Sequence, residues 1–254
     1  MGIGYRELAA SLREAIERGT YPPGSTLPKQ EEIAAEHDVN IKTVRQAVRL
    51  LEAEGLVTPV RRRGTVVREH PPIARLGAER YAKSKWKFGV VAFAADREAS
   101  GRTWKLSDQT NQTRKVDADR EITEAFGLPV DAPVYERRRL VKDAGTPTHT
   151  LTSYYRPEDV EGTPLTDPKP GPAGAGGGFA VLTLQGLEPD TITESVHARM
   201  PTPDEIRELE LPAGEPVMVL QRRTYTADGR LIEVARGVHA ASRFVWSYTF
   251  KIPD

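Results

Sequence analysis

Long polar side chains with the spacing of a single helical face occur in the first third of the chain. They are Lys42, Arg45, Gln46 and Arg49. Positions i, i+3, i+4 and i+7 fall on one stripe of a helix, and this stripe contains no acid. Arginine and glutamine on a helix can read guanine and adenine edges in the major groove of DNA. A solvated amphipathic helix would show the same spacing, so the stripe alone leaves both interpretations open.

The helix that would carry this stripe has a favourable start and an apolar face. Asn40 is a good N-cap residue, and Thr43 follows at the third helical position. The apolar face is predicted to consist of Ile41, Val44, Val48 and Leu51. We therefore expect a helix that begins after Asn40 and packs one face against other elements.

Two helices are predicted before this one. Apolar residues recur at helical spacing from Tyr5 to Ile16, and Gly19 suits the position after a helix end. A second short helix is predicted over 29–34, with acids in its first turn, where the helix dipole favours them. A tight turn would join it to the helix with the polar stripe. Two short helices in this arrangement form a helix-turn-helix.

Residues 55–67 read as a β-hairpin that follows the helices. The predicted tip is Arg62, Arg63 and Gly64, with glycine supplying the turn. A run of arginines is by itself most often a solvated patch. Directly after a helix-turn-helix, an arginine-rich tip is better explained as a wing that contacts a narrow, electronegative minor groove.

The composition narrows the class of protein. A chain of 254 residues suggests about two domains. Because there is no cysteine and the histidines lack metal-binding spacing, no disulfide, metal site or cofactor is expected. No signal peptide or membrane-spanning run is evident, so we expect a cytoplasmic protein without membrane contact. Net charge is zero, but seven basic residues face two acids between Lys42 and Arg68, which confines any nucleic-acid footprint to that segment.

Arg137 and Arg139 are the best anion-binding candidates in the second half of the chain. They lie two apart on a predicted strand and therefore face the same side of it. Two guanidiniums on one face could clamp a carboxylate or a phosphate. The alternative is an exposed sheet face whose arginines pair with surface acids.

The second half is predicted to be an α+β domain with a mostly antiparallel sheet. Strands are indicated over 87–94, 134–142, 148–155, 192–200, 216–226, 231–239 and 247–252. Helices are indicated over 120–126, 179–185 and 202–210, with a helical turn at 96–100. The glycine- and proline-rich residues 168–178 are predicted to be a surface loop, and 104–116 fit no element clearly.

Residues 5–68 resemble the winged helix-turn-helix of the GntR family of bacterial transcription regulators. The resemblance is carried by Tyr5, Leu8, Leu12, Ile16, Gly19, Pro23-Gly24, Leu27-Pro28, Thr43-Val44-Arg45, Ala47, Leu51, Gly55-Leu56 and Gly64-Thr65. Lys29-Gln30 and Asn40-Ile41 replace the family's usual Ser-Glu and Ser-Arg, and Ile41 could instead meet a thymine methyl group. The predicted DNA-binding residues are Lys29, Asn40, Lys42, Thr43, Arg45, Gln46, Arg49, Arg62, Arg63 and Gly64.

Most of residues 76–252 resemble the UTRA domain, the effector-sensing module of HutC-type GntR regulators, which shares its fold with chorismate lyase. The resemblance is carried mainly by Phe93 to Gly101, the Arg137/Arg139 strand, Thr152 to Tyr155, Glu194 with Arg199, Asp228-Gly229 with Glu233, and Arg243-Phe244. It implies an effector site formed by Phe93, Ala94, Arg137, Arg139, Ser153, Glu233 and His239. Ala94 stands where phosphosugar-binding relatives have a serine, which leaves backbone donors to hold an anion. Glu233 could accept hydrogen bonds from the ligand.

The sequence as a whole predicts a DNA-binding regulator rather than an enzyme. Residues 1–69 are expected to be the winged helix-turn-helix, 70–75 a linker, and 76–254 an effector-binding and dimerisation domain. The expected partners are a double-stranded DNA operator, a second copy of the chain and a small anionic effector, and repression is the expected outcome. Two alternatives stay open: an enzyme related to chorismate lyase, which would need a catalytic pair that the sequence does not show, and a DNA-binding dimer that senses nothing.

Overall fold

The computed structural model describes residues 3–60, 62–68, 72–212 and 214–252. The chain divides into two compact units. The first consists of Met1–Pro72 with Leu211–Glu215 and Ala241–Arg243, and the second of Ile73–Glu210, Pro216–Ala240 and Phe244–Asp254.

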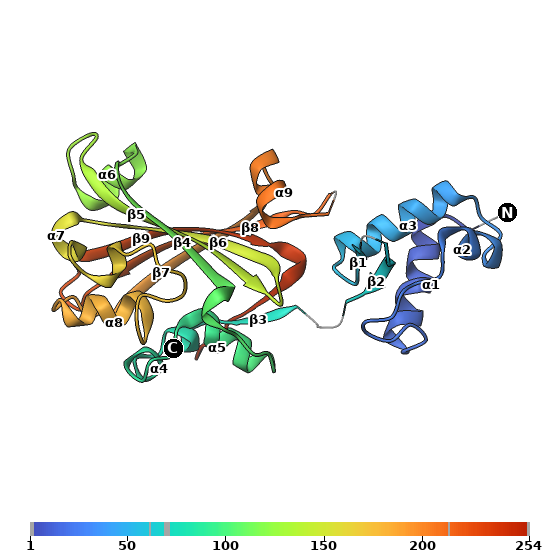
Figure 1. The fold of residues 1–254 in the computed structure, drawn as a ribbon, viewed down its shortest axis with the longest axis horizontal. Helices are drawn as coiled ribbons and strands as arrows, with labels where there is room; N and C mark the ends of the chain where they lie inside the picture. The colour runs from blue at the N-terminus through green and yellow to red at the C-terminus, as the bar shows by residue number, and fades with distance from the viewer. Residues whose placement is uncertain (1–2, 61, 69–71, 213, 253–254) are drawn as a thin grey trace. The chain divides into compact units, whose positions relative to one another are not determined.

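The N-terminal unit is a three-helix bundle with a hairpin (Figure 1). Its elements are α1 (Tyr5–Glu17), α2 (Gln30–Glu36), α3 (Ile41–Ala53), β1 (Val57–Val60) and β2 (Gly64–Val67). The two strands pair antiparallel, with Val60 opposite Gly64 next to the turn. Gly19 has a φ of 79°, as expected of the residue that follows a helix end. The predicted winged helix-turn-helix is thereby confirmed.

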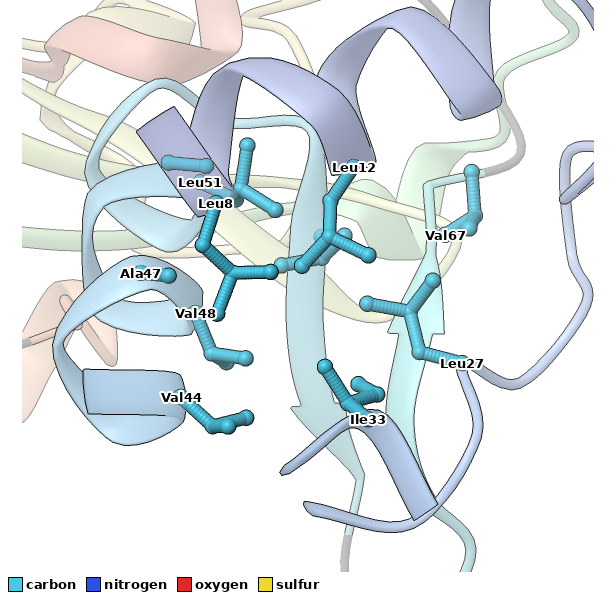
Figure 2. Packing of buried hydrophobic residues seen from close by; sticks show 11 residues of the cluster. Leu8, Leu12, Leu27, Ile33, Val44, Ala47, Val48, Leu51 and Val67 are labelled. Carbon is cyan, nitrogen blue, oxygen red and sulfur yellow. The ribbon is translucent and has the colours of Figure 1, made fainter. Parts of the chain in front are cut away.

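One buried cluster joins all three helices to the wing (Figure 2). Its members include Leu8, Leu12, Leu27, Ile33, Val44, Ala47, Val48, Leu51, Val57 and Val67. Ile41 was expected on the buried stripe of α3, but its side chain is 37% exposed. Ile41 is the first residue of α3, one turn before the first buried position, Val44, so the apolar stripe of the helix reaches the core only from Val44 onward.

The C-terminal unit is built on one six-stranded sheet in which every neighbouring pair is antiparallel. In spatial order the strands are β4 (Gln109–Asp117), β5 (Pro133–Asp143), β6 (Thr146–Tyr155), β9 (Leu231–Ala240), β8 (Val217–Tyr225) and β7 (Thr191–Arg199). A separate parallel pair joins β3 (Ile73–Leu76) to β10 (Phe244–Ser247). The predicted antiparallel α+β class is confirmed.

Short helices cover both faces of this sheet (Figure 1). α6 (Arg120–Phe126) and α9 (Pro203–Leu209) lie on one face, and α4 (Lys83–Lys87), α5 (Ala92–Ala99) and α8 (Gly177–Leu184) lie on the other. The remaining helical segments are α7 (Pro157–Val160) and the 3-10 turns Ala78–Tyr81, Leu106–Asp108, Pro164–Thr166 and Ala241–Arg243. Because side chains alternate along a strand, the face below α6 carries apolar residues such as Val134 and Val234.

The structure corrects several expected elements of the C-terminal unit. Residues 87–94 are not a strand: they contain the end of α4, a short connection and the start of α5. The apolar residues there are buried against the sheet, and short apolar runs do not distinguish a strand from a buried helix. The last strand is Phe244–Ser247 rather than 247–252. The range expected as a linker, 70–75, overlaps β3 from Ile73 onward. Residues 70 and 71 lie outside the described residues.

Asn40 provides a test of how α3 is anchored. Its Oδ1 accepts a hydrogen bond from the backbone N–H of Thr43 at 2.8 Å. Replacing Asn40 with Ala should destabilise the N-terminal unit by about 1 kcal/mol, because one N–H at the helix start loses its acceptor. Urea unfolding followed by circular dichroism measures the loss, and Asn40→Asp, which keeps the acceptor, is the matched control. Equal stability of Asn40→Ala and the wild type would show that the cap contributes nothing.

Candidate nucleic-acid interface and anion site

The outer face of α3 is a row of exposed cationic and amide side chains. Its members are Lys42, Arg45, Gln46 and Arg49, and all four are exposed. The opposite face, from Val44 to Leu51, is buried in the core of the unit. The structure thus places the predicted polar stripe where it can enter a major groove.

Gln30, which was not among the predicted residues, holds one member of this row. The Nε atom of Arg45 donates to Oε1 of Gln30 at 3.1 Å. Gln30 is the first residue of α2, so this contact links the two helices of the helix-turn-helix. Neither terminal nitrogen of Arg45 has an acceptor among the described residues, and the glutamine restricts where these nitrogens point.

The predicted residues nearest the helix starts have local roles. Asn40 uses its oxygen to cap α3, and its Oδ1 also accepts from the Thr43 hydroxyl at 3.2 Å. Lys29 is the exposed N-cap residue of α2, and its backbone N–H donates to Glu32 at 2.9 Å. The amide nitrogen of Asn40 and the amine of Lys29 are therefore the groups that these two residues could offer to DNA.

The tip of the wing is exposed and sharply bent. Arg62 and Gly64 have φ angles of 66° and 96°, so both residues adopt a left-handed backbone at the turn. Arg62, Arg63 and Gly64 are all exposed. The guanidinium of Arg63 donates to the carbonyl of Gly24, which fixes the tip to the turn before α2. Arg62 has no such contact among the described residues.

The C-terminal unit encloses a cavity of about 100 Å³ between the sheet and the helices α4, α5 and α8, here named the inner cavity. This is several times the space that one water molecule needs. Its polar and charged lining consists of Arg80, Tyr81, Gln109, Arg137, Arg139, His149, Tyr155, Arg222 and Glu233. Trp86, Phe93, Leu151 and Phe179 are among the apolar residues that complete the walls.

Arg137 and Arg139 reach the inner cavity without an acidic partner. Among the described residues, neither forms an ion pair with a carboxylate, although Arg137 is only 2% exposed. Arg137 Nη1 donates to the carbonyls of Leu165 and Asp167 at 3.1 and 2.7 Å. Arg139 donates to the Leu151 carbonyl and to the Ser153 hydroxyl. Arg137 Nη2 and Arg139 Nη1 find no acceptor among the described residues, and both remain available to a ligand.

Burial makes these two charges unfavourable as they stand. It lowers the pKa of Arg137 to about 10, with a further contribution from the charge of Arg139. Burial also lowers the pKa of Arg139 below its ordinary value. A lowered pKa means that the folded protein stabilises the charged form less than water does. An anion bound beside both groups would reverse this loss, so the site favours occupation by a carboxylate or phosphate.

Two helices begin at the inner cavity. Val91, the N-cap residue of α5, lines the cavity, and so does Gly176, the N-cap residue of α8. The first N–H groups of a helix have no intrahelical acceptor and form the positive end of its dipole. Val91 and Gly176 have no side-chain acceptor for these groups, and at the start of α8 the N–H of Gly177 donates to the Gly174 carbonyl at 3.1 Å. The two helix starts therefore add to the positive potential of the arginines.

Glycines allow α8 to begin this close to α4 and α5. Gly176 and Gly177 have φ angles of 77° and 66°, which glycine adopts without strain. A Cβ atom on Gly176 would collide with the backbone carbonyl of Trp86, and one on Gly177 would lie 2.8 Å from Val91 Cγ1. Residues 168–178 were predicted to be a surface loop. The end of this range instead forms part of the cavity wall.

Glu233 lines the inner cavity, but its carboxylate is already occupied. Its Oε1 accepts from Ser153 at 2.6 Å and from Tyr155 at 3.0 Å. Its Oε2 accepts from Thr224 at 3.0 Å and from Arg222 at 2.9 Å. Contrary to the expectation that it accepts from a ligand, Glu233 has no lone pair to spare. It neutralises Arg222 and, through Ser153, orients Arg139.

The predicted effector residues fall into two groups. Phe93, Arg137, Arg139 and Glu233 line the inner cavity. Ala94, Ser153 and His239 do not line it. Ala94 is fully buried within α5, and Ser153 lies behind Arg139.

His239 does not reach the inner cavity but packs against His149, a residue that does. Its ring stacks on that of His149 with centroids 4.6 Å apart, and His149 is the histidine that lines the cavity. Burial, reinforced by nearby arginines such as Arg80, holds the pKa of His149 well below its ordinary value. His149 is therefore neutral at pH 7, so its ring can form hydrogen bonds but carries no charge.

Several cavity residues were not predicted, and only some carried a sequence signal. Tyr155 stands two residues after Ser153 on β6, so strand alternation alone would have placed it on the same face. Arg80, Trp86 and Phe179 come from helical segments whose position over the sheet no local pattern reveals.

The described residues contain no group of three or more histidine, aspartate or glutamate side chains arranged to hold a metal ion. None of the described helices is long and apolar enough to span a membrane.

Comparison with known proteins shows to which family the chain belongs. Residues 4–67 match the description of bacterial regulatory proteins of the gntR family, and residues 107–245 match the UTRA domain. An uncharacterised HTH-type transcriptional regulator of Streptomyces coelicolor is 51% identical over 251 residues, which cover 98% of this chain and 93% of that protein. The histidine utilization repressor of Pseudomonas putida is 24% identical over 256 residues, covering 96% and 92% of the two chains.

A solved structure agrees with the fold. PhnF from Mycobacterium smegmatis superposes with a TM-score of 0.60 at 22% identity, over 97% of this chain and 100% of that one. The relatives are transcription regulators, so the enzyme alternative is set aside. The chain belongs to the GntR family of bacterial transcription regulators, in which it is a HutC-type member with a C-terminal UTRA domain.

Proposed function

We propose that this regulator is a homodimeric repressor whose affinity for a near-palindromic operator is controlled by a small anion bound in the inner cavity. DNA binding is assigned to the winged helix-turn-helix of residues 1–69. Effector binding and dimerisation are assigned to the C-terminal domain, whose first strand starts at Ile73. Repression is supported by the name of the P. putida relative.

The observation that carries the sensor part of this proposal is that Arg137, which is buried, and Arg139, which is half-buried, form no ion pair with a carboxylate among the described residues. Elsewhere in the C-terminal unit, deeply buried arginines such as Arg75 and Arg222 are paired with a carboxylate. Leaving Arg137 and Arg139 unpaired is costly unless something else supplies the negative charge. A bound metabolite with a carboxylate or phosphate group would supply it.

A homodimer is proposed because one recognition helix reads only one half-site. Two copies related by a two-fold axis would place two α3 helices in successive major grooves, which matches a near-palindromic operator. The effector regulates this complex only if it binds the DNA-competent and DNA-incompetent states with different affinity. A dimer that binds DNA but senses nothing is the remaining alternative, and the absence of binding across a panel of anionic metabolites would favour it.

Base reading is tested at Arg45. Arg45→Ala should cost about 1–3 kcal/mol of specific binding and relax the preference at one base pair per half-site. Gln30→Ala should relax the same base pair less strongly, because Arg45 stays but is no longer held. Selection of bound sequences from a random pool gives the preference at each position. Arg18→Ala, an exposed arginine just after α1, is the control, and an Arg45→Ala profile identical to the control would remove Arg45 from the reading set.

The wing is tested through salt dependence. Replacing Arg62 and Arg63 with Ala should weaken binding to all sequences and reduce the slope of log affinity against log salt by about one per lost phosphate contact. Fluorescence anisotropy with operator and random duplexes at several salt concentrations measures the slope. The single variant Arg62→Ala separates the DNA contact from the link between Arg63 and Gly24. An unchanged slope with loss of one base preference would assign the wing to base reading instead.

The sensor is tested at Arg137 and Arg139. Substituting either with Ala should raise the effector concentration needed for response by about one to two decades, since a charge-assisted hydrogen bond contributes about 1.5–3 kcal/mol. Operator affinity without effector should stay close to that of the wild type. Arg138→Ala is the matched control, because Arg138 lies on the same strand but pairs with Glu208. A response at wild-type effector concentration in both test variants would place the anion elsewhere.

A further inference from the structure

A second, larger hollow adjoins the inner cavity in the C-terminal unit. This outer cavity has a volume of about 390 Å³. Lys83, Asp190, Ile192, Glu194 and Tyr248 contribute to its lining. It lies beside the edge strand β7, which supplies Ile192 and Glu194.

The two cavities share a wall of aromatic side chains. Tyr81, Trp86 and Phe179 line both, so the partition is one side chain thick. The ring of Phe179 meets Trp86 edge-on at 6.3 Å and lies 5.9 Å from the ring of Tyr81. The Tyr81 hydroxyl is fixed by hydrogen bonds with Glu194 and Arg222. The Phe179 ring forms no hydrogen bond, and the guanidinium of Arg222 lies over it at 5.5 Å from the centroid. A ligand that spans both cavities would have to displace this ring.

Size limits what the inner cavity can hold. An engineered cavity of about 150 Å³ is large enough for benzene. The inner cavity, at about 100 Å³, is smaller, so it accommodates a group the size of a carboxylate or phosphate but not a ring as well. The body of any larger effector must extend beyond the wall, and the outer cavity is more than twice the benzene-sized volume.

Charge distinguishes the two cavities. The inner one contains Arg137 and Arg139 without acidic partners, as described above. In the outer one each carboxylate is paired: Glu194 accepts from Arg75 at 2.6 Å, and Asp190 accepts from Lys83 at 3.1 Å. An anionic group is therefore favoured on the inner side, and an uncharged group on the outer side.

Building on the anion site proposed above, we propose that the effector occupies both cavities, with its anionic group at Arg137 and Arg139 and an uncharged, flat ring in the outer cavity. The aromatic side chains of Trp86, Phe179 and Tyr248 line the outer cavity, and aromatic rings pack favourably against one another. The effector class is thus a ring-bearing phosphate or carboxylate rather than a free inorganic anion.

The test compares inorganic phosphate with phenyl phosphate as probes. Calorimetric titration of the full chain at constant ionic strength should show phenyl phosphate binding about tenfold more tightly or better, because the ring buries apolar surface. Ile192→Trp should fill the outer cavity and reduce the ratio of the two affinities about tenfold. Thr193→Trp is the matched control: it is the next residue on β7, but its side chain is exposed and points to the opposite face.

The possible results separate the two proposals. The two-cavity site is supported if phenyl phosphate binds more tightly than inorganic phosphate, and if this difference in affinity disappears in Ile192→Trp but remains in Thr193→Trp. If phosphate binds but the ring adds nothing, or if the two tryptophan variants behave alike, the two-cavity site is wrong and the anion site stands. If neither probe binds, the anion site fails and the inference fails with it. Ile192→Phe, a smaller change, replaces Ile192→Trp if that variant does not fold.

Discussion

The buried ion pair between Glu233 and Arg222 organises the polar face of the C-terminal sheet. Each oxygen of this carboxylate accepts at least two hydrogen bonds from the protein, so the carboxylate pairs with Arg222 and holds Ser153, Tyr155 and Thr224. Burial alone would raise the pKa of Glu233, but the charges of Arg222 and Arg139 hold it below its ordinary value. The stabilisation is therefore present at neutral pH and is lost as pH falls through the folded-state pKa of Glu233.

The proposed effector site rests on arginines of the inner cavity with which Glu233 forms no ion pair. Glu233 lines the inner cavity and, among the described residues, forms an ion pair with Arg222 but not with Arg139, whose charge it feels at longer range. Arg80 is neutralised by Asp96 from α5, which leaves Arg137 and Arg139 to a ligand. On α3, the exposed row of Lys42, Arg45, Gln46 and Arg49 contains no acid, and Glu52 follows one turn after Arg49. In the proposed function, each half of the molecule therefore presents positive charge to a different anionic partner, DNA or the effector.

Periodic patterns predicted the fold well where one local signal decides it. Helix α6 runs over the predicted residues, because Asp119 caps its start and Gly127, with a φ of 66°, ends it. The prediction of a strand at 87–94 was wrong because these residues are helical and pack against Val141, a contact that is distant in the sequence. The same distinction between local signals and long-range contacts applies to the site residues. Alternation placed Arg137 and Arg139 on one face, but the contact between Gln30 and Arg45 depends on how two helices cross, which no local spacing encodes.

Thermodynamic linkage offers the most direct test of an effector that controls DNA binding. If an anion in the inner cavity changes operator affinity by some factor, operator DNA must change the affinity for that anion by the same factor. The measurement is the dissociation constant of the anionic effector for the dimer, free and saturated with operator at one ionic strength. The account predicts that the two dissociation constants differ by the factor that the effector imposes on DNA binding. Equal dissociation constants in the two titrations would contradict it.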